Sequence, residues 1–158
     1  TLSTVSVKNG NVIYSSPAGT ASVALPDNNL ESWYYLTLSH CHARGETCLY
    51  LNGVGSSPIK EKLNPEIFTF GGYSGNITTI PDSLSLRDWM IHRSSLTSYE
   101  AKNYMEWKML GSSLEIYAPL CDLVPGTKVE NRAQSLTEIV LSENAKYKTM
   151  KIGMKREL

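Results

Sequence analysis

Residues 33–53 read WYYLTLSHCHARGETCLYLNG, and this stretch decides the fold class. Apolar and polar residues alternate on both sides of the polar turn at 43–46, as they do in strands that place one face on a core. The pattern predicts a β-hairpin of strands 33–42 and 47–52. The expected core face carries Leu36, Leu38, His40, Leu49 and Leu51. The expected opposite face carries Trp33, Tyr35 and Tyr50.

Short strands and turn signals continue on both sides of this hairpin. Asn9-Gly10-Asn11 predicts a tight turn, because Asn and Gly accept positive φ, and a further strand follows Pro17-Ala18-Gly19. Residues 73–81 read as a loop. Later strands are expected at 67–70, 84–92 and 114–120 and within 128–141.

One helix is expected, over about 98–109. Thr97 and Glu100 have the spacing of a capping box, in which Thr97 accepts from the third helical amide while Glu100 reaches back. Gly111 is the expected stop. The helical face is expected to comprise Tyr104, Met105, Trp107 and Leu110. Many short strands with one late helix predict an all-β, antiparallel β-sandwich.

The composition of the chain disfavours two classes of protein, nucleic-acid-binding and membrane-spanning. The chain has 158 residues, 41% apolar, with 15 basic and 15 acidic side chains. Zero net charge disfavours nucleic acid as a partner, since binding phosphates requires a basic surface. No apolar run approaches the roughly 18 residues of a membrane span. We expect a single domain over 1–158, taken from a longer chain, with closing strands in 111–145 and a basic tail at 146–158.

The odd number of cysteines excludes complete pairing within one chain. They are Cys41, Cys48 and Cys121. If Arg44-Gly45 forms a two-residue loop, Cys41 lies opposite Cys48 within reach of a disulfide; the alternative is two semi-buried thiols. His40 and His42 fall on the face opposite to both thiols, which disfavours a zinc site.

Two stretches, at 33–53 and 86–100, together resemble the concanavalin A-like lectin/glucanase superfamily in its laminin G-like and pentraxin-like branch. The shared features are a strand opened by Trp33, a return strand ending in Asn52-Gly53, and a late strand running into Leu-Thr-x-x-Glu and a helix. The resemblance covers about residues 30–110 and implies a jelly-roll sandwich of two sheets. It leaves function open, since members bind glycans, bind proteins or hydrolyse glycosides. The opening strand of a complete module is missing from its usual place.

A hydrolase would need two facing carboxyl groups about 5–10 Å apart. Asp82, Asp88 and Glu100 are instead spread over a loop, a strand and a helix cap, so we expect no enzyme, and a degenerate glycoside hydrolase is the weakest hypothesis. Calcium binding is an alternative role for the oxygen-rich loops, because calcium takes six to eight oxygen ligands. The candidate ligands are Asp27, Asn28 and Asp82; the other interpretation is that they are turn residues.

A sugar-binding site needs an aromatic side chain beside polar groups. The candidates are Tyr73, Asn76, Trp33 and Tyr50, with core packing as the alternative for the large aromatics. Asn76-Ile77-Thr78 also fits an N-glycosylation acceptor, which favours the secretory pathway. The leading hypothesis is a non-catalytic module that binds glycan or protein. The alternative is an intracellular scaffolding β-sandwich that docks neighbouring domains of its own chain.

Overall fold

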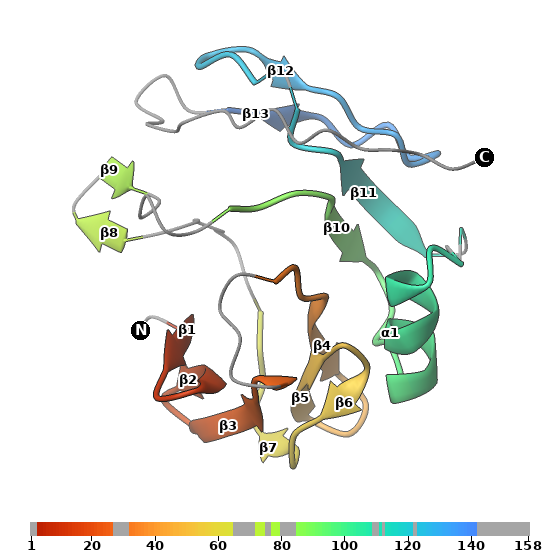
Figure 1. The fold of residues 1–158 in the computed structure, drawn as a ribbon. Coiled ribbons are helices and arrows are strands. Elements are labelled where there is room, and N and C mark those ends of the chain that lie inside the picture. Colours follow the sequence, from red (N-terminus) through yellow and green to blue (C-terminus); the bar gives the residue numbers. More distant parts are fainter. Residues whose placement is uncertain are drawn as a thin grey trace. The chain divides into compact units, whose positions relative to one another are not determined.

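The computed structural model describes residues 3–26, 32–64, 72–74, 77–79, 85–108, 111, 113–121 and 123–141, with 72–74 and 77–79 described for the backbone alone. These residues form antiparallel strands and one short helix, which confirms the predicted all-β class (Figure 1). The chain divides into two compact units. Unit 1 is Thr1–Pro65 with Arg93–Ser113, and unit 2 is Glu66–His92 with Leu114–Leu158.

The first sheet of unit 1 is an antiparallel meander of β1 (Thr4–Lys8), β2 (Asn11–Ser16) and β3 (Gly19–Ala24). The turn between β1 and β2 places Asn9 at φ 50° and Gly10 at φ 70°. Two successive positive φ values match the right-handed twist of the flanking strands. The predicted tight turn and the strand after it are confirmed.

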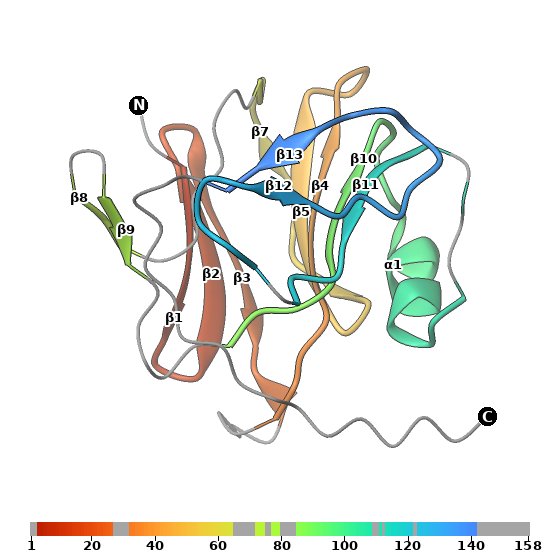
Figure 2. The ribbon, with the colours of Figure 1, turned by 90° about the horizontal axis from the view of Figure 1, so that it is seen from above.

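The second sheet of unit 1 is built around a central strand. That strand is β5 (Glu46–Leu51), which pairs antiparallel with β4 (Leu36–Cys41), β6 (Val54–Gly55) and β7 (Ile59–Lys60). Figure 2 shows β5 from above with β4 and β7 beside it. The predicted hairpin is therefore confirmed, with a shorter first strand.

The register of this hairpin differs from the prediction by two residues. Cys41 pairs with Glu46 and Ser39 pairs with Cys48, so the connecting turn is the four residues 42–45. A two-residue loop would need a positive φ at Arg44, and within this turn only Gly45 has one, at 57°. The two thiols are diagonal neighbours on one face, and all three cysteines of the chain are free.

The two sheets of unit 1 share one hydrophobic core, with β3 packed against β5 and β7. The core consists of Val12, Tyr14, Ala21, Val23, Leu25, Leu49, Leu51 and Ile59. The predicted core face is thus correct on β5 and wrong on β4, where Leu36 is 46% and Leu38 is 37% exposed. Both leucines lie opposite buried leucines, but β4 is the edge strand and extends beyond the packed area.

Helix α1 (Ser98–Met105) packs against β6 and the turn that precedes it. The predicted capping box between Thr97 and Glu100 is present. Ala101 and Tyr104 are buried, and the Tyr104 ring stacks on Tyr35 with centroids 6.3 Å apart and planes 6° apart. The described residues include no helix long and apolar enough to cross a membrane.

The helix ends earlier than predicted. The Trp107 amide donates to the Tyr104 carbonyl at 3.0 Å, and the Lys108 amide donates to the Asn103 carbonyl at 2.9 Å. This pair of bonds is the Schellman arrangement, in which the residue after the cap adopts a left-handed conformation. Trp107 occupies that position at φ 59°, so the predicted helix to 109 with Gly111 as its stop is wrong.

The described residues of unit 2 form three separate strand pairs. The first, β8 (Gly72–Ser74) with β9 (Ile77–Thr79), is an antiparallel pair where a loop was predicted. The second is β10 (Trp89–His92) with β11 (Leu114–Ala118). The predicted strand from 84 begins only at 89, because Asp88 has φ 54°, which interrupts an extended chain.

The last strand pair of unit 2 is β12 (Lys128–Val129) with β13 (Ile139–Val140), where one strand was predicted within 128–141. Asn131 organises the connection. Its side-chain oxygen accepts from the Tyr117 amide at 3.0 Å, and its amide nitrogen donates to the carbonyls of Glu115 and Thr137 at 3.2 and 3.0 Å. The predicted tail at 146–158 and the strand at 67–70 lie outside the described residues.

Candidate functional site

The most unusual described residue of unit 1 is Trp107, directly after α1. Its side chain is 52% exposed and its φ is 59°. The left-handed region costs an L-residue roughly 1–2 kcal/mol, and glycine is the usual occupant at this point of a Schellman motif. The buried half of the side chain offsets this cost, while the other half stays in solvent. Strained backbone of this kind concentrates at functional sites, which makes Trp107 a candidate contact residue.

Polar groups flank Trp107, and a second exposed aromatic residue lies on α1. Tyr99, on the first turn of α1, is 75% exposed. Glu106 and Lys108 flank the tryptophan and form an ion pair of 2.8 Å. The hydrogen bond from Lys108 lowers the pKa of the Glu106 carboxyl, and the Lys108 charge also interacts with Tyr99. We call Tyr99, Glu106, Trp107 and Lys108 the α1 surface.

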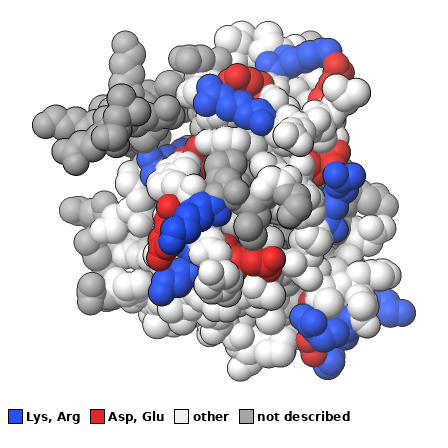
Figure 3. Space-filling view, turned by 90° about the vertical axis from the view of Figure 1, so that its right-hand side faces the viewer, with Lys and Arg blue, Asp and Glu red and all other residues white. Residues whose placement is uncertain are grey.

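The α1 surface is neither strongly acidic nor strongly basic. It carries one carboxylate and one ammonium group that neutralise each other. On the face that Figure 3 presents, basic and acidic side chains are likewise interspersed among uncharged residues. A surface of this composition favours ligands that engage aromatic rings and hydrogen bonds over highly charged ligands.

Two of the four predicted ligand residues have described side chains. Trp33, just before β4, is 44% exposed. Tyr50 is half-buried and packs over Gly55, where a Cβ atom would lie 2.8 Å from the tyrosine ring. Burial raises the pKa of Tyr50, and its hydrogen bond with the Cys48 thiol adds to the shift. Tyr73 lies in β8 with its side chain outside the described set, and Asn76 lies outside it altogether.

The predicted calcium ligands Asp27, Asn28 and Asp82 all lie outside the described residues. Within the described ranges, no three His, Cys, Asp or Glu side chains come together as a metal site. The ring centroids of His40 and His42 are 6.3 Å apart, which agrees with the expectation that they share a face. Calcium binding by the loops that carry Asp27, Asn28 and Asp82 therefore stays a prediction.

The two described carboxylates considered for a hydrolase have other partners. Asp88 accepts from the Tyr117 hydroxyl at 3.1 Å, and Arg87 lies 3.4 Å from its second oxygen. Glu100 accepts from the Thr97 amide at 2.7 Å within the capping box. Asp88 belongs to unit 2 and Glu100 to unit 1. Each carboxylate stabilises the local backbone or side chains of its own unit.

A polar cluster lies at one end of the core of unit 1. The Tyr14 hydroxyl donates to Glu61 at 2.8 Å, and His40 Nδ1 lies 2.9 Å from the Thr47 hydroxyl. Burial raises the pKa of Glu61, but hydrogen bonds from Thr47, Ser16 and Tyr14 outweigh it and hold the pKa below its usual value. Thr47 is fully buried, so no substrate reaches its hydroxyl. We assign this cluster to stability.

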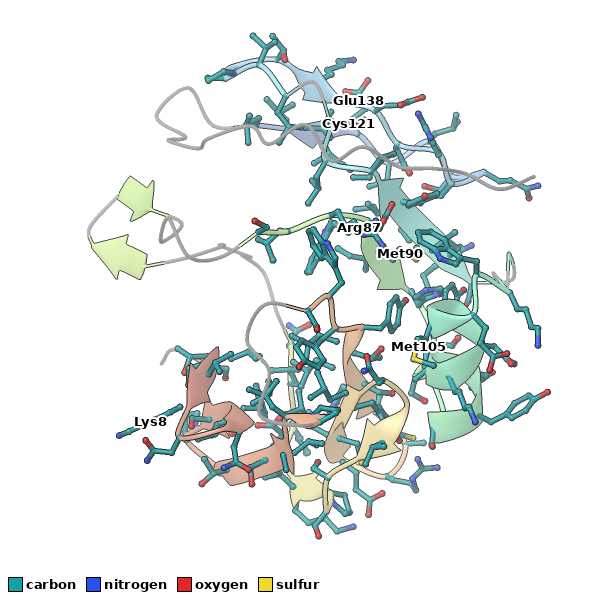
Figure 4. The ribbon with its side chains drawn as sticks, viewed as in Figure 1. Lys8, Arg87, Met90, Met105, Cys121 and Glu138 are labelled. Carbon is teal, nitrogen blue, oxygen red and sulfur yellow. The ribbon has the colours of Figure 1, made fainter. Side chains whose placement is uncertain are left out.

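The α1 surface was not predicted from the sequence, for a physical reason. Trp107 was predicted on the apolar face of a helix over about 98–109, whereas the helix ends at Met105 and leaves Trp107 half exposed. Figure 4 shows Met105 in this last turn. Nothing in the local sequence marks a tryptophan as the left-handed residue, because glycine and asparagine are the usual signals for that position.

A scan of protein-family models, a search of curated proteins and a search of solved structures each found no match to this chain.

Proposed function

We propose that this chain is a non-catalytic binding module, a jelly-roll sandwich of the concanavalin A-like type, that holds a glycan on the α1 surface. Trp107 carries the proposal. It combines a left-handed backbone, which glycine would adopt without strain, with a large aromatic ring that stays half exposed. The exposed half of this ring is available for a ligand contact.

The support beneath the α1 surface suits a binding role. The capping box fixes the start of α1, the Tyr35–Tyr104 stack fixes its inner face, and the Ser98 hydroxyl donates to the Gly53 carbonyl at 2.8 Å. An aromatic group on a rigid element loses little conformational entropy on binding, so more of the contact energy appears as affinity.

The chemistry of the α1 surface favours sugars. Aromatic faces at Tyr99 and Trp107 offer stacking area, while Glu106 and Lys108 supply hydrogen-bond acceptors and donors. Trp33, which is 44% exposed, is a second aromatic candidate in the same unit. Calcium has a role in glycan binding only if the loops that carry Asp27 and Asp82 bind it.

The first experiment applies the purified chain to a broad glycan array, with calcium and with chelator. We expect binding that Trp107→Gly abolishes, while the free energy of unfolding of this variant falls by no more than about 1–2 kcal/mol, because relief of the backbone strain offsets part of the loss of the half-buried ring. Leu136→Ala is the matched control, since Leu136 is 97% exposed in unit 2. Glycan binding that survives in Trp107→Gly would place the site elsewhere.

A second candidate function is docking of a protein, as in a scaffolding domain. The observation that favours it is a set of exposed aliphatic residues on the core-side face of the edge strands β1 and β4. They are Val5, Val7, Leu36 and Leu38. Sugars do not need aliphatic surface, whereas protein interfaces do. A protein partner that no longer binds the double variant Leu36→Ser/Leu38→Ser, but still binds Trp107→Gly, would favour this function.

A further inference from the structure

The turn of the β4–β5 hairpin brings together two free thiols and a cation. Cys41 is the last residue of β4, and Cys48 lies on the same face of β5, two pairs further from the turn. Both are partly exposed. The guanidinium of Arg44, within the turn, forms an ion pair of 2.9 Å with Glu46.

Cys41 has the surroundings of a reactive thiol. Hydrogen bonding from the Arg44 backbone is the largest influence that lowers the pKa of this thiol, and hydrogen bonding from Ser95 and from the Ala43 backbone acts in the same direction. Partial burial opposes these effects, but together with the Arg44 charge they lower the pKa of the Cys41 thiol. The thiolate is the nucleophilic form of cysteine, and partly exposed, electropositive sites are where reactive thiols occur.

We propose that Cys41 and Cys48 form a redox-responsive thiol pair, in which Cys41 attacks a hydroperoxide and Cys48 resolves the product to a disulfide. This inference is independent of the α1 surface, and it adds a modification site to unit 1.

The chemistry balances with one molecule of hydrogen peroxide as the hydroperoxide. The Cys41 thiolate attacks one peroxide oxygen, the O–O bond breaks, and the leaving hydroxide takes up a proton to become water. The Cys48 thiolate then attacks the Cys41 sulfenic sulfur, forming the S–S bond and releasing a second water. Two thiols lose two electrons and two protons, and the peroxide is reduced to two waters.

The diagonal placement makes this oxidation reversible. Diagonal Cα atoms in an antiparallel pair are about 7–8 Å apart, beyond the usual disulfide range of about 4.4–6.8 Å. Closing the bond therefore requires the end of β4 and the turn at 42–45 to move. Strained disulfides are the more easily reduced ones, so the free thiols are the resting state and a small thiol restores them.

The experiment treats the full chain with hydrogen peroxide and maps the cysteines by mass spectrometry. We expect a linked pair of peptides containing Cys41 and Cys48, lighter by two hydrogens, which a small thiol reverses. In Cys48→Ser we expect a Cys41 sulfenic acid that dimedone traps. Cys121, exposed in unit 2 after β11 and labelled in Figure 4, is the internal control.

The rates provide the decisive comparison. At neutral pH we expect iodoacetamide to label Cys41 at least about fivefold faster than the more exposed Cys121, since thiolate character outweighs exposure. Arg44→Gln should slow the labelling of Cys41 several-fold and leave Cys121 unchanged. Equal rates at Cys41 and Cys121, an Arg44→Gln variant with unchanged labelling, or peroxide treatment that oxidises Cys121 while the pair stays reduced would each overturn the proposal.

Discussion

At the scale of single residues, the stability of unit 1 depends on a buried tyrosine whose hydroxyl donates a hydrogen bond to a carboxylate. Tyr14 is 1% exposed, and its hydroxyl donates to Glu61 at 2.8 Å. We expect Tyr14→Phe to lower the free energy of unfolding by about 1–2 kcal/mol, because a hydrogen bond to a charged group is lost. Denaturant titration measures the change. Tyr34→Phe is the control, since its 3.3 Å bond to the Pro26 carbonyl is exposed, and its cost should stay below about 0.5 kcal/mol.

The lowered pKa of Glu61 also predicts that the folded chain loses stability in acid. Its pKa is held below the usual value in the folded chain, so the folded state favours the ionised form. The stabilisation is fully present above the ordinary carboxyl pKa of about 4.3, and it is lost as the pH falls through the lower folded value. Wild type should therefore lose more stability between about pH 6 and pH 3 than Glu61→Gln does. Parallel loss in both proteins would contradict this account.

Single residues were predictable where the signal is local. The Asn9-Gly10 turn and the capping box of Thr97 and Glu100 follow from the backbone preferences and side-chain reach of adjacent residues. The left-handed Trp107 was not predictable, because the end of α1 depends on how the helix packs and on the bonds that close its last turn. Local preference for glycine pointed to Gly111 instead.

At the scale of elements, the attachment of α1 depends on a close approach at Gly53. A Cβ atom on Gly53 would lie 2.8 Å from Lys102 Cβ, and the φ of 78° disfavours any L side chain. We expect Gly53→Ala to lower the free energy of unfolding by about 1–3 kcal/mol, by strain and displacement of the helix. Near-ultraviolet circular dichroism and denaturant titration measure both effects.

Gly111 provides the matched control for Gly53. A Cβ atom there would meet nothing within 4 Å, so Gly111→Ala should leave stability within about 0.5 kcal/mol of wild type. If the two variants are equally stable, the close contact between α1 and the turn after β5 is not a determinant of the fold.

Elements were predictable from periodicity, but their registers were not. Alternation identified the β4–β5 hairpin, and the same alternation is preserved when one strand slides by two residues. The slide from the predicted pairing of Cys41 with Cys48 to the observed pairing with Glu46 is of this kind. What separates the two registers is the conformation of Arg44 in the turn, which the apolar pattern does not encode.

At the scale of the whole molecule, burial is divided unequally between the two units. Unit 1 contains a continuous core of eight buried apolar residues from two sheets. Among the described residues of unit 2, only Leu114 and Ala118 are fully buried. Composition shows that a core can form, but it does not show which strands share it, because the partners are distant in the sequence. Leu36 and Leu38 illustrate this. They alternate with polar residues as core residues do, yet they are exposed on the edge strand β4.

Unequal burial predicts unequal protection from hydrogen exchange. Local opening costs least where few apolar contacts hold the backbone and the strands are short. We expect the amides of β2, β3 and β5 to exchange slowest, with protection near the global free energy of unfolding. We expect the two-residue strands β12 and β13 to exchange fastest among the described strands, even though Lys128 and Glu138 form an ion pair beside them, because an exposed pair contributes little. Native-state exchange monitored by NMR or mass spectrometry measures this order, and equal protection of β5 and β12 would show that the units open together as one cooperative structure.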